Sequence, residues 1–261
     1  MFKKLVFSMS IFCLFLQIGN AQNTSKERPS FNILQLTSDP IVDGNIINEE
    51  LWKSITPITE LTQIKPMFDV SASEKTEIRV AYSKSMFYVA VVCYDSNPET
   101  IVVSDSRRDS DLNDEDSFLF IVDTYNDQQN GFLFGTNSNG LEYDAQIDNE
   151  GQGNFNQNRQ QVGVIGGTNI NWDASWTVKT ETGDYGWSAE FQIPLKTLRF
   201  GKGNKKCGLN IQRNIRNKNE RSFWSPLPLT FGIARLSMAG DLMDLDLKTQ
   251  GNLKVIPYVL G

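Results

Sequence analysis

Apolar and polar residues alternate in short runs between residues 76 and 214, the period-two pattern of strands that bury one face. Glycine, proline, asparagine and aspartate separate these runs, as expected at turns. We therefore predict an all-β fold, an antiparallel β-sandwich of jelly-roll or immunoglobulin-like type. The predicted strands are residues 77–82, 86–94, 117–123, 131–137, 141–147, 175–180, 185–194 and 208–214.

The pattern before and after these strands is different. Asn48 is a suitable cap for one short N-terminal helix over residues 49–52, and residues 22–35 are polar enough to predict a linker. The sandwich is expected over residues 36–248. Residues 249–261 end on an apolar strand without a turn, so we interpret them as the start of a further C-terminal region.

Tryptophan is concentrated on the predicted hairpin of residues 175–194, with Trp172, Trp176 and Trp187 close together and Gly183-Asp184 as the turn. Indole faces stack on sugar rings, but they are also common in sandwich cores. We take Trp172, Trp176 and Trp224 as candidate carbohydrate-stacking residues. Arg213 is a candidate hydrogen-bond donor to sugar hydroxyls.

The first residues predict export. Lys3 and Lys4 precede an apolar run, and Gly19-Asn20-Ala21 supplies the small residues of a cleavage site, so residues 1–21 are read as a signal peptide. The expected location is the periplasm, the outer membrane or the cell surface. Cleavage removes two lysines and no acidic residue, which changes the formal charge from −6 to −8.

Composition excludes several classes of function. The negative charge argues against nucleic acid as a partner, and the basic segment 213–221 is interpreted as a solvated face. The chain has no histidine, which excludes Ser-His and Cys-His nucleophile pairs. A glycoside hydrolase would need two carboxylates at a set distance, and the sequence alone does not bring Glu142, Asp144 and Glu190 together.

Six acidic residues fall between Asp105 and Asp116. Such a cluster is either a solvated loop or a site for a hard cation such as Ca²⁺, whose ligands are oxygen atoms. The spacing does not match an EF-hand loop. Cys93 and Cys207 lie in strand-like segments, and the sequence leaves open whether they pair or stay as buried thiols.

Seven segments, in this order, resemble the family 9 carbohydrate-binding module-like domains, a DOMON-like β-sandwich. The similarity covers about residues 36–235. The segments are VDGNIINEELW (42–52), TEIRVAYSKSMFYVAVVCYDSNP (76–98), DEDSFLFIVD (114–123), GFLFGTNSNG (131–140), WDASW (172–176), GWSAEFQIPLKTLRF (186–200) and CGLNIQRNIRNKNERSFW (207–224).

The resemblance implies carbohydrate binding and not catalysis within the domain; hydrolase activity would come only by association. Structural calcium in the family suggests Asp95 and Asp116 as candidate metal ligands. The sequence departs from the sugar-binding members at three positions. Asn113, Leu119 and Gly135 stand where those members have tryptophan, glutamate and arginine.

The segments RNIR, WSP and LKVIPYVLG also resemble Bacteroidetes-type proteins in which this domain precedes a C-terminal outer-membrane barrel region. Three hypotheses follow. In the first, the domain recognises a glycan beside its own barrel region and takes part in polysaccharide breakdown. In the second, it has lost the sugar site and serves as a structural or docking domain of that barrel. In the third, it is part of a glycoside hydrolase.

Overall fold

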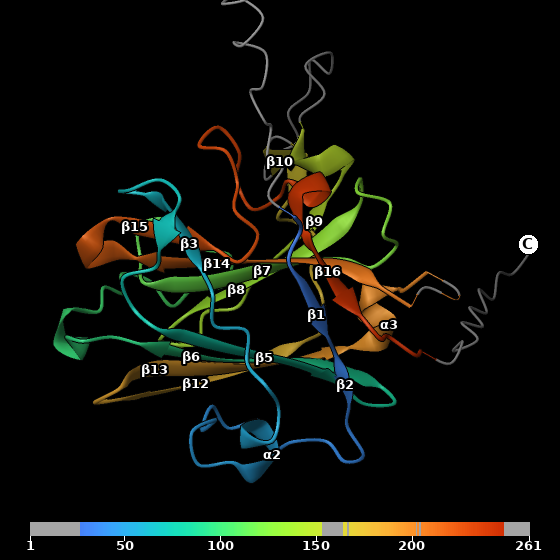
Figure 1. Ribbon diagram of the computed structural model, residues 1–261, viewed down its shortest axis with the longest axis horizontal. Helices are drawn as coiled ribbons and strands as arrows, with labels where there is room; N and C mark the ends of the chain where they lie inside the picture. Colours follow the sequence, from blue (N-terminus) through green and yellow to red (C-terminus); the bar gives the residue numbers. More distant parts are fainter. Residues whose placement is uncertain (1–26, 153–163, 166, 202, 204, 248–261) are drawn as a thin grey trace, which may run out of the picture.

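Two β-sheets packed face to face form the computed structural model, which describes residues 27–152, 164–165, 167–201, 203 and 205–247 (Figure 1). The predicted signal peptide and the predicted start of a C-terminal region lie outside the described residues. The all-β sandwich is confirmed. Among the described residues, no helix has the length and apolar character needed to cross a membrane.

Sheet A holds eleven strands and sheet B holds five. The main path of sheet A runs β10 (Val164–Ile165), β11 (Thr168–Asn169), β9 (Tyr143–Ile147), β8 (Gly131–Asn137), β7 (Ser117–Asp123), β14 (Cys207–Ile215), β15 (Glu220–Phe223), β3 (Thr62–Lys65) and β4 (Val70–Ser71). Beside this path, β16 (Gly240–Met243) pairs with β14, and β1 (Ser30–Asn32) pairs with β16. Sheet B runs β12 (Thr177–Gly183), β13 (Gly186–Pro194), β6 (Met86–Tyr94), β5 (Thr76–Tyr82) and β2 (Leu34–Gln35).

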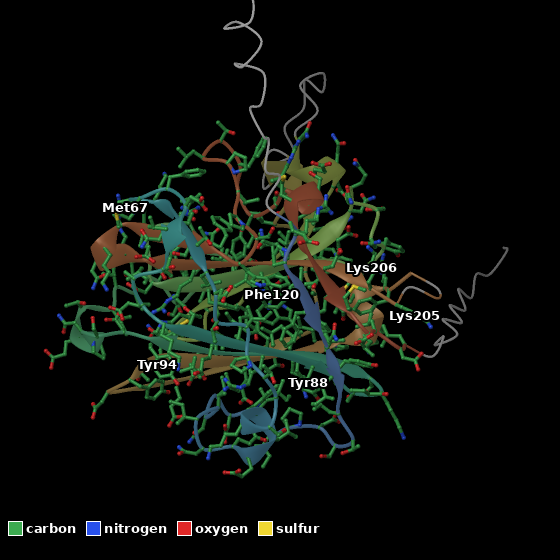
Figure 2. The ribbon with its side chains drawn as sticks, viewed as in Figure 1. Met67, Tyr88, Tyr94, Phe120, Lys205 and Lys206 are labelled. Carbon is green, nitrogen blue, oxygen red and sulfur yellow. The ribbon has the colours of Figure 1, made fainter. Side chains whose placement is uncertain are left out.

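The main core lies between the two sheets, because alternate side chains of each strand point to the face that the other sheet covers. Phe120 of β7 is fully buried there, with its ring 5.1 Å from that of Phe191 on β13 and perpendicular to it (Figure 2). Cys93 and Cys207 also belong to this core, and both are buried free thiols. The expected hairpin of β12 and β13 is present, but its turn residues are Asp184 and Tyr185, because Gly183 pairs with Gly186.

A second apolar layer covers the outer face of sheet B. It consists of the segment before β3, with the short helix α2 (Glu50–Lys53) (Figure 1). Glu190 of β13 anchors the segment: its carboxylate accepts hydrogen bonds from the Trp52 indole at 2.5 Å and from the backbone N–H groups of Asp43 and Gly44 at 2.9 and 2.7 Å. The predicted helix is thus present, but Glu49 occupies the cap position in place of Asn48, without a side-chain cap.

The predicted linker contains two strands. β1 runs parallel to β16, and β2 runs parallel to β5, whereas the other strand pairs among the described residues are antiparallel. Ile33 between β1 and β2 is buried in the core. The polar composition of this segment gave no strand pattern. Its strands form through backbone hydrogen bonds to β16 and β5 and through the burial of Ile33. The sandwich therefore begins before residue 36.

Four short 3₁₀ turns and one further helix complete the described secondary structure. They are η1 (Pro98–Thr100), η2 (Asn149–Gly151), α3 (Leu195–Leu198), η3 (Arg216–Lys218) and η4 (Leu236–Met238).

Candidate functional site

The candidate stacking rings do not form one exposed platform. Trp176 and Trp224 are each 7% exposed and belong to the core between the sheets. Trp176 stacks on Phe191 at 5.7 Å, and Trp172 is partly buried and stacks on Phe132 at 4.8 Å. The sequence pattern found these rings, but Trp176, just before β12, and Trp224, just after β15, both pack between the sheets.

Arg213 is also a core residue, at 2% exposure. From β14 in sheet A its guanidinium reaches sheet B, where it donates to the Lys75 carbonyl and the Thr76 hydroxyl at 2.9 Å and to the Tyr94 carbonyl at 2.6 Å. These bonds join the two sheets. The structure therefore places Arg213 away from any surface that a sugar could reach.

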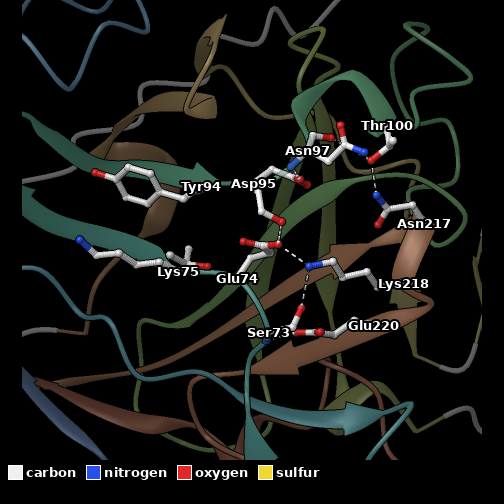
Figure 3. Close-up of polar contacts among 12 residues, drawn as sticks. Ser73, Glu74, Lys75, Tyr94, Asp95, Asn97, Thr100, Asn217, Lys218 and Glu220 are labelled. Atoms are coloured by element: carbon white, nitrogen blue, oxygen red, sulfur yellow. Dashed lines mark hydrogen bonds and ion pairs between the residues drawn. The ribbon is translucent and has the colours of Figure 1, made fainter.

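Asp95 and Asp116 lie near each other at one end of the sandwich. Burial raises the pKa of Asp116, and the charge of Asp95 adds to this. Asp95 accepts the Asn97 N–H at 2.7 Å through one oxygen (Figure 3), while its other oxygen is buried and has no hydrogen-bond partner among the described residues. Asp116 accepts the Val102 N–H at 2.8 Å.

A calcium ion takes six to eight oxygen ligands. The described residues contain no group of three acidic, histidine or cysteine side chains that could hold a metal. The guanidinium of Arg213 is a positive charge near Asp116 and stabilises its ionised form, as a bound cation would. The single unpartnered oxygen of Asp95 is thus too little for a calcium site by itself.

The acidic segment before β7 is neutralised from within. Glu115 is buried and accepts hydrogen bonds from Ser104, from the Asp105 N–H and from Asn137. Asp105 pairs with Arg107. The segment is therefore mostly a hydrogen-bonded turn, and less a solvated loop than expected.

Of the three candidate carboxylates for glycoside hydrolysis, Glu142 and Asp144 lie together, and Glu190 is separated from both in the fold. Glu142 and Asp144 lie at β9 in sheet A and both bind Arg108. Asp144 also accepts the indole N–H of Trp176 at 3.0 Å. Glu190 lies in sheet B, where it holds the N-terminal segment. All three carboxylates have structural partners.

The outer face of sheet A carries the positions that match the family's sugar contacts. Leu119 and Gly135 are paired neighbours on this face, and Leu112 packs over both. A Cβ atom placed on Gly135 would lie 2.8 Å from the Leu112 side chain and 3.0 Å from that of Leu119. The loop of residues 226–239 adds Leu227 and Leu236 to the same layer. Apolar packing therefore fills this face at the two positions where the sequence resemblance implies sugar contacts.

A polar pocket remains at the edge of this face, beside the ends of β3, β14 and β15. We call it the β15 pocket. Its volume is about 150 Å³. Asn113, the third of the departing positions, lies on its wall. The lining residues are Lys65, Asn113, Asp114, Asn214, Ile215, Arg216, Asn219, Glu220 and Arg221.

Amide groups and a guanidinium organise the pocket. Arg221 is half-buried and donates to the side-chain oxygens of Asn113 at 3.0 Å and Asn214 at 3.2 Å. Asn214 is in turn fixed by hydrogen bonds to the Leu112 carbonyl and the Ser117 hydroxyl. Placed polar groups of this kind are what specific recognition of small ligands requires.

The segment 213–221 is not the solvated face that the sequence suggested. Arg213 is buried, Arg221 is half-buried, and Arg216 is exposed. Strand alternation in this segment could have shown that Arg213 and Arg221 lie in paired strands. The pocket itself depends on β3 and on residue 113, which are far from this segment in the sequence, and no local pattern connects them.

Comparison with known proteins identifies the family of this sandwich. Residues 42–225 match the model of the carbohydrate family 9 binding domain-like proteins, and the chain belongs to that family. A search of curated proteins finds none that matches.

Solved structures share the fold. A carbohydrate binding module of family 9 from Caldicellulosiruptor kristjanssonii, in complex with glucose and in complex with cellotriose, gives a TM-score of 0.56 at 13% identity, covering 88% of this chain and 100% of that chain. A proposed carbohydrate-binding protein from Bacteroides uniformis ATCC 8492 gives 0.57 at 15% identity, covering 83% and 99%. At these identities the likeness shows the fold alone.

Proposed function

We propose that this domain binds carbohydrate, and that it does so at the β15 pocket. Membership in the carbohydrate family 9 binding domain-like proteins supports the class of ligand, as do the related folds that hold glucose and cellotriose. The observation that carries the location is the filled outer face of sheet A. Because Leu112 covers Leu119 and Gly135, the polar groups that remain beside them are those of the β15 pocket at the edge of this face.

The wider setting is part of the same proposal. The domain is exported and stays beside a C-terminal outer-membrane barrel region of its own chain, where glycan capture would serve polysaccharide breakdown. The signal-peptide pattern of residues 1–21 supports export, and the resemblance of the segments RNIR, WSP and LKVIPYVLG to Bacteroidetes-type barrel proteins supports the barrel region.

A glycan-array screen of the purified chain tests the proposal. We expect retention by at least one glycan, and a loss of several-fold in affinity for Asn113→Ala, since this change removes an amide from the pocket wall. Asn48→Ala, an exposed asparagine near the helix on the far side of sheet B, is the matched control and should bind as the wild type does.

A second function is favoured by the same filled face. Apolar packing at Leu119 and Gly135 also fits a domain that has kept the fold and serves as a docking domain of the barrel protein. In that case the folded chain would bind no glycan on the array. Retention of the chain by purified outer-membrane fragments, without any sugar competitor, would then be expected.

A further inference from the structure

Arg221 is a partly desolvated cation with neutral partners. Its hydrogen bonds go to two amide oxygens, and among the described residues no carboxylate lies within 4.0 Å of its guanidinium. Burial lowers the pKa of Arg221, while Asp111 and Asp114 oppose this from a longer distance. A guanidinium has five N–H donors, so this one keeps unused donors that could bind both oxygens of an anionic group.

Lys65 stands directly across from Arg221. The two residues are cross-strand partners in the β3–β15 pair, next to a shift in register between Arg221 and Ser222. Like charges directly opposite each other are unfavourable in a sheet. Lys65 is exposed, and no described carboxylate lies within ion-pair distance of it. An anion between the two cations would relieve this repulsion.

The other charges of the pocket do not supply that anion. Asp114 faces Arg216, 3.5 Å away. Glu220 is buried and accepts hydrogen bonds from the Ser73 N–H and the Ser222 hydroxyl. The pair of Lys65 and Arg221 is therefore a positive spot without a direct ion pair among the described residues, on a chain whose formal charge is −6, and Asp111 and Asp114 act on Arg221 only from a longer distance.

We infer that the β15 pocket is specific for an acidic sugar, whose carboxylate or sulfate binds between Arg221 and Lys65 while nearby amides bind its hydroxyls. The inference rests on the proposed function and names its ligand class. A volume of about 150 Å³ has room for such a group and part of one sugar ring. Bidentate binding by arginine gives the contact its geometry.

Calorimetry on the full chain with matched ligand pairs tests this inference. One pair is trigalacturonate and its methyl ester, and the other is a galactose disaccharide with and without a 6-sulfate. We expect one acidic member to bind at least tenfold more tightly than its neutral partner. Which pair shows the difference identifies the group as a carboxylate or a sulfate.

Three variants locate the effect. Arg221→Gln and Lys65→Gln should each weaken the acidic ligand at least fivefold, and Lys179→Gln, an exposed lysine of β12 in the other sheet, should not. Lys65→Gln changes an exposed side chain, so it keeps the test valid even if Arg221→Gln fails to fold.

The outcomes separate the inference from the proposed function. Equal binding of acidic and neutral members, or acidic binding that survives both substitutions, would overturn the acidic-sugar inference and leave carbohydrate binding standing. Absence of binding to every glycan by a folded chain would overturn both.

Discussion

Arg213 and Arg221 lie on neighbouring strands of the same sheet, but they meet different surroundings. Arg213 points into the core, where two carbonyls and a hydroxyl of the other sheet accept its hydrogen bonds. Arg221 points to the outer face, where its acceptors among the described residues are two side-chain amides. The hydrogen bonds of Arg213 thus join the two sheets, while Arg221 keeps N–H donors that a ligand could use.

Glu74 joins three loops at one end of the sandwich. Its carboxylate accepts the Ser96 hydroxyl at 2.6 Å and pairs with Lys218 (Figure 3), and the side chain is 11% exposed. Burial raises its pKa, but the hydrogen bonds from Lys218 and Ser96 outweigh this and leave the pKa of Glu74 below its usual range.

Glu74→Gln should therefore lower the free energy of unfolding at pH 7 by about 1 kcal/mol. A carboxyl whose pKa is lowered by folding contributes stability above its unfolded pKa of about 4.3 and loses it as the pH falls through the folded value. The difference between wild type and variant in urea unfolding should thus shrink below about pH 4. Glu99→Gln, at an exposed glutamate nearby, is the control, and an equal loss there would contradict the role of the Glu74 network.

Sequence patterns at this scale indicate the side of a strand on which a residue lies, but not what covers that side. The pattern identified Trp176 and Arg213 as candidates for a site, and their alternation is compatible with either face of the sheet. Contacts with residues distant in the sequence decided that both are buried: Arg213 bonds to Tyr94, 119 positions away, and Trp176 packs on Phe134, 42 positions away.

At the scale of elements, the outer layer on sheet A distinguishes this sandwich from one that is open to sugar. Leu112 comes from the segment before β7, and Leu236 comes from η4, far along the chain. Both pack on strands whose outward positions are apolar, such as Leu119 and Ile121. The layer therefore forms a second, smaller core on the outer face of sheet A.

Gly135→Ala tests how tightly this layer is packed. The added methyl group would meet Leu112 and Leu119 at distances that require movement, so we expect a loss of about 1–3 kcal/mol in the free energy of unfolding. In a Leu112→Ala background the same change should cost clearly less, because the space is then free.

Gly232→Ala provides the matched control, since a Cβ atom at this exposed glycine would meet no atom within 4 Å. Denaturant unfolding of the cycle formed by the wild type, Gly135→Ala, Leu112→Ala and the double variant measures the coupling energy between the two positions. Additive losses in that cycle would mean that Leu112 does not fill the space above Gly135.

Hairpins between neighbouring segments could be predicted from the sequence, because a turn and two alternating runs are local. The strands β1 and β2 could not, since their partners β16 and β5 lie elsewhere in the chain. The loop over sheet A could not be predicted either. Its apolar residues are scattered at irregular spacing and show no strand or helix period.

At the scale of the whole molecule, the guanidinium of Arg213 is a positive charge near Asp116, and the described residues contain no group of three side chains that could hold a metal ion. We therefore expect 1 mM Ca²⁺ to change the melting temperature by less than about 1 °C. A site with a dissociation constant of about 10 µM would instead add about 2.7 kcal/mol, or several degrees. Differential scanning fluorimetry with Ca²⁺ and with EDTA distinguishes the two. A rise that Asp95→Ala abolishes would establish the calcium site that the family resemblance suggested.

The two core thiols provide a check on the packing of the whole sandwich. Burial raises the pKa of Cys93 to about 11 and also raises that of Cys207. Because the thiolate is the reactive form, neither should be alkylated by iodoacetamide in the native protein at pH 8, whereas both should react in guanidinium chloride. Peptide mapping by mass spectrometry measures this, and a disulfide between them under non-reducing conditions would contradict the structure.

The parallel pairing of β1 with β16 has a mechanical consequence. The chain enters β1 at one end of this pair and leaves β16 at the opposite end, because the two strands run in the same direction. A force that pulls the two termini apart would therefore load their hydrogen bonds in shear, so that these bonds must break together. The sandwich should resist extension from its ends better than peeling from an internal loop.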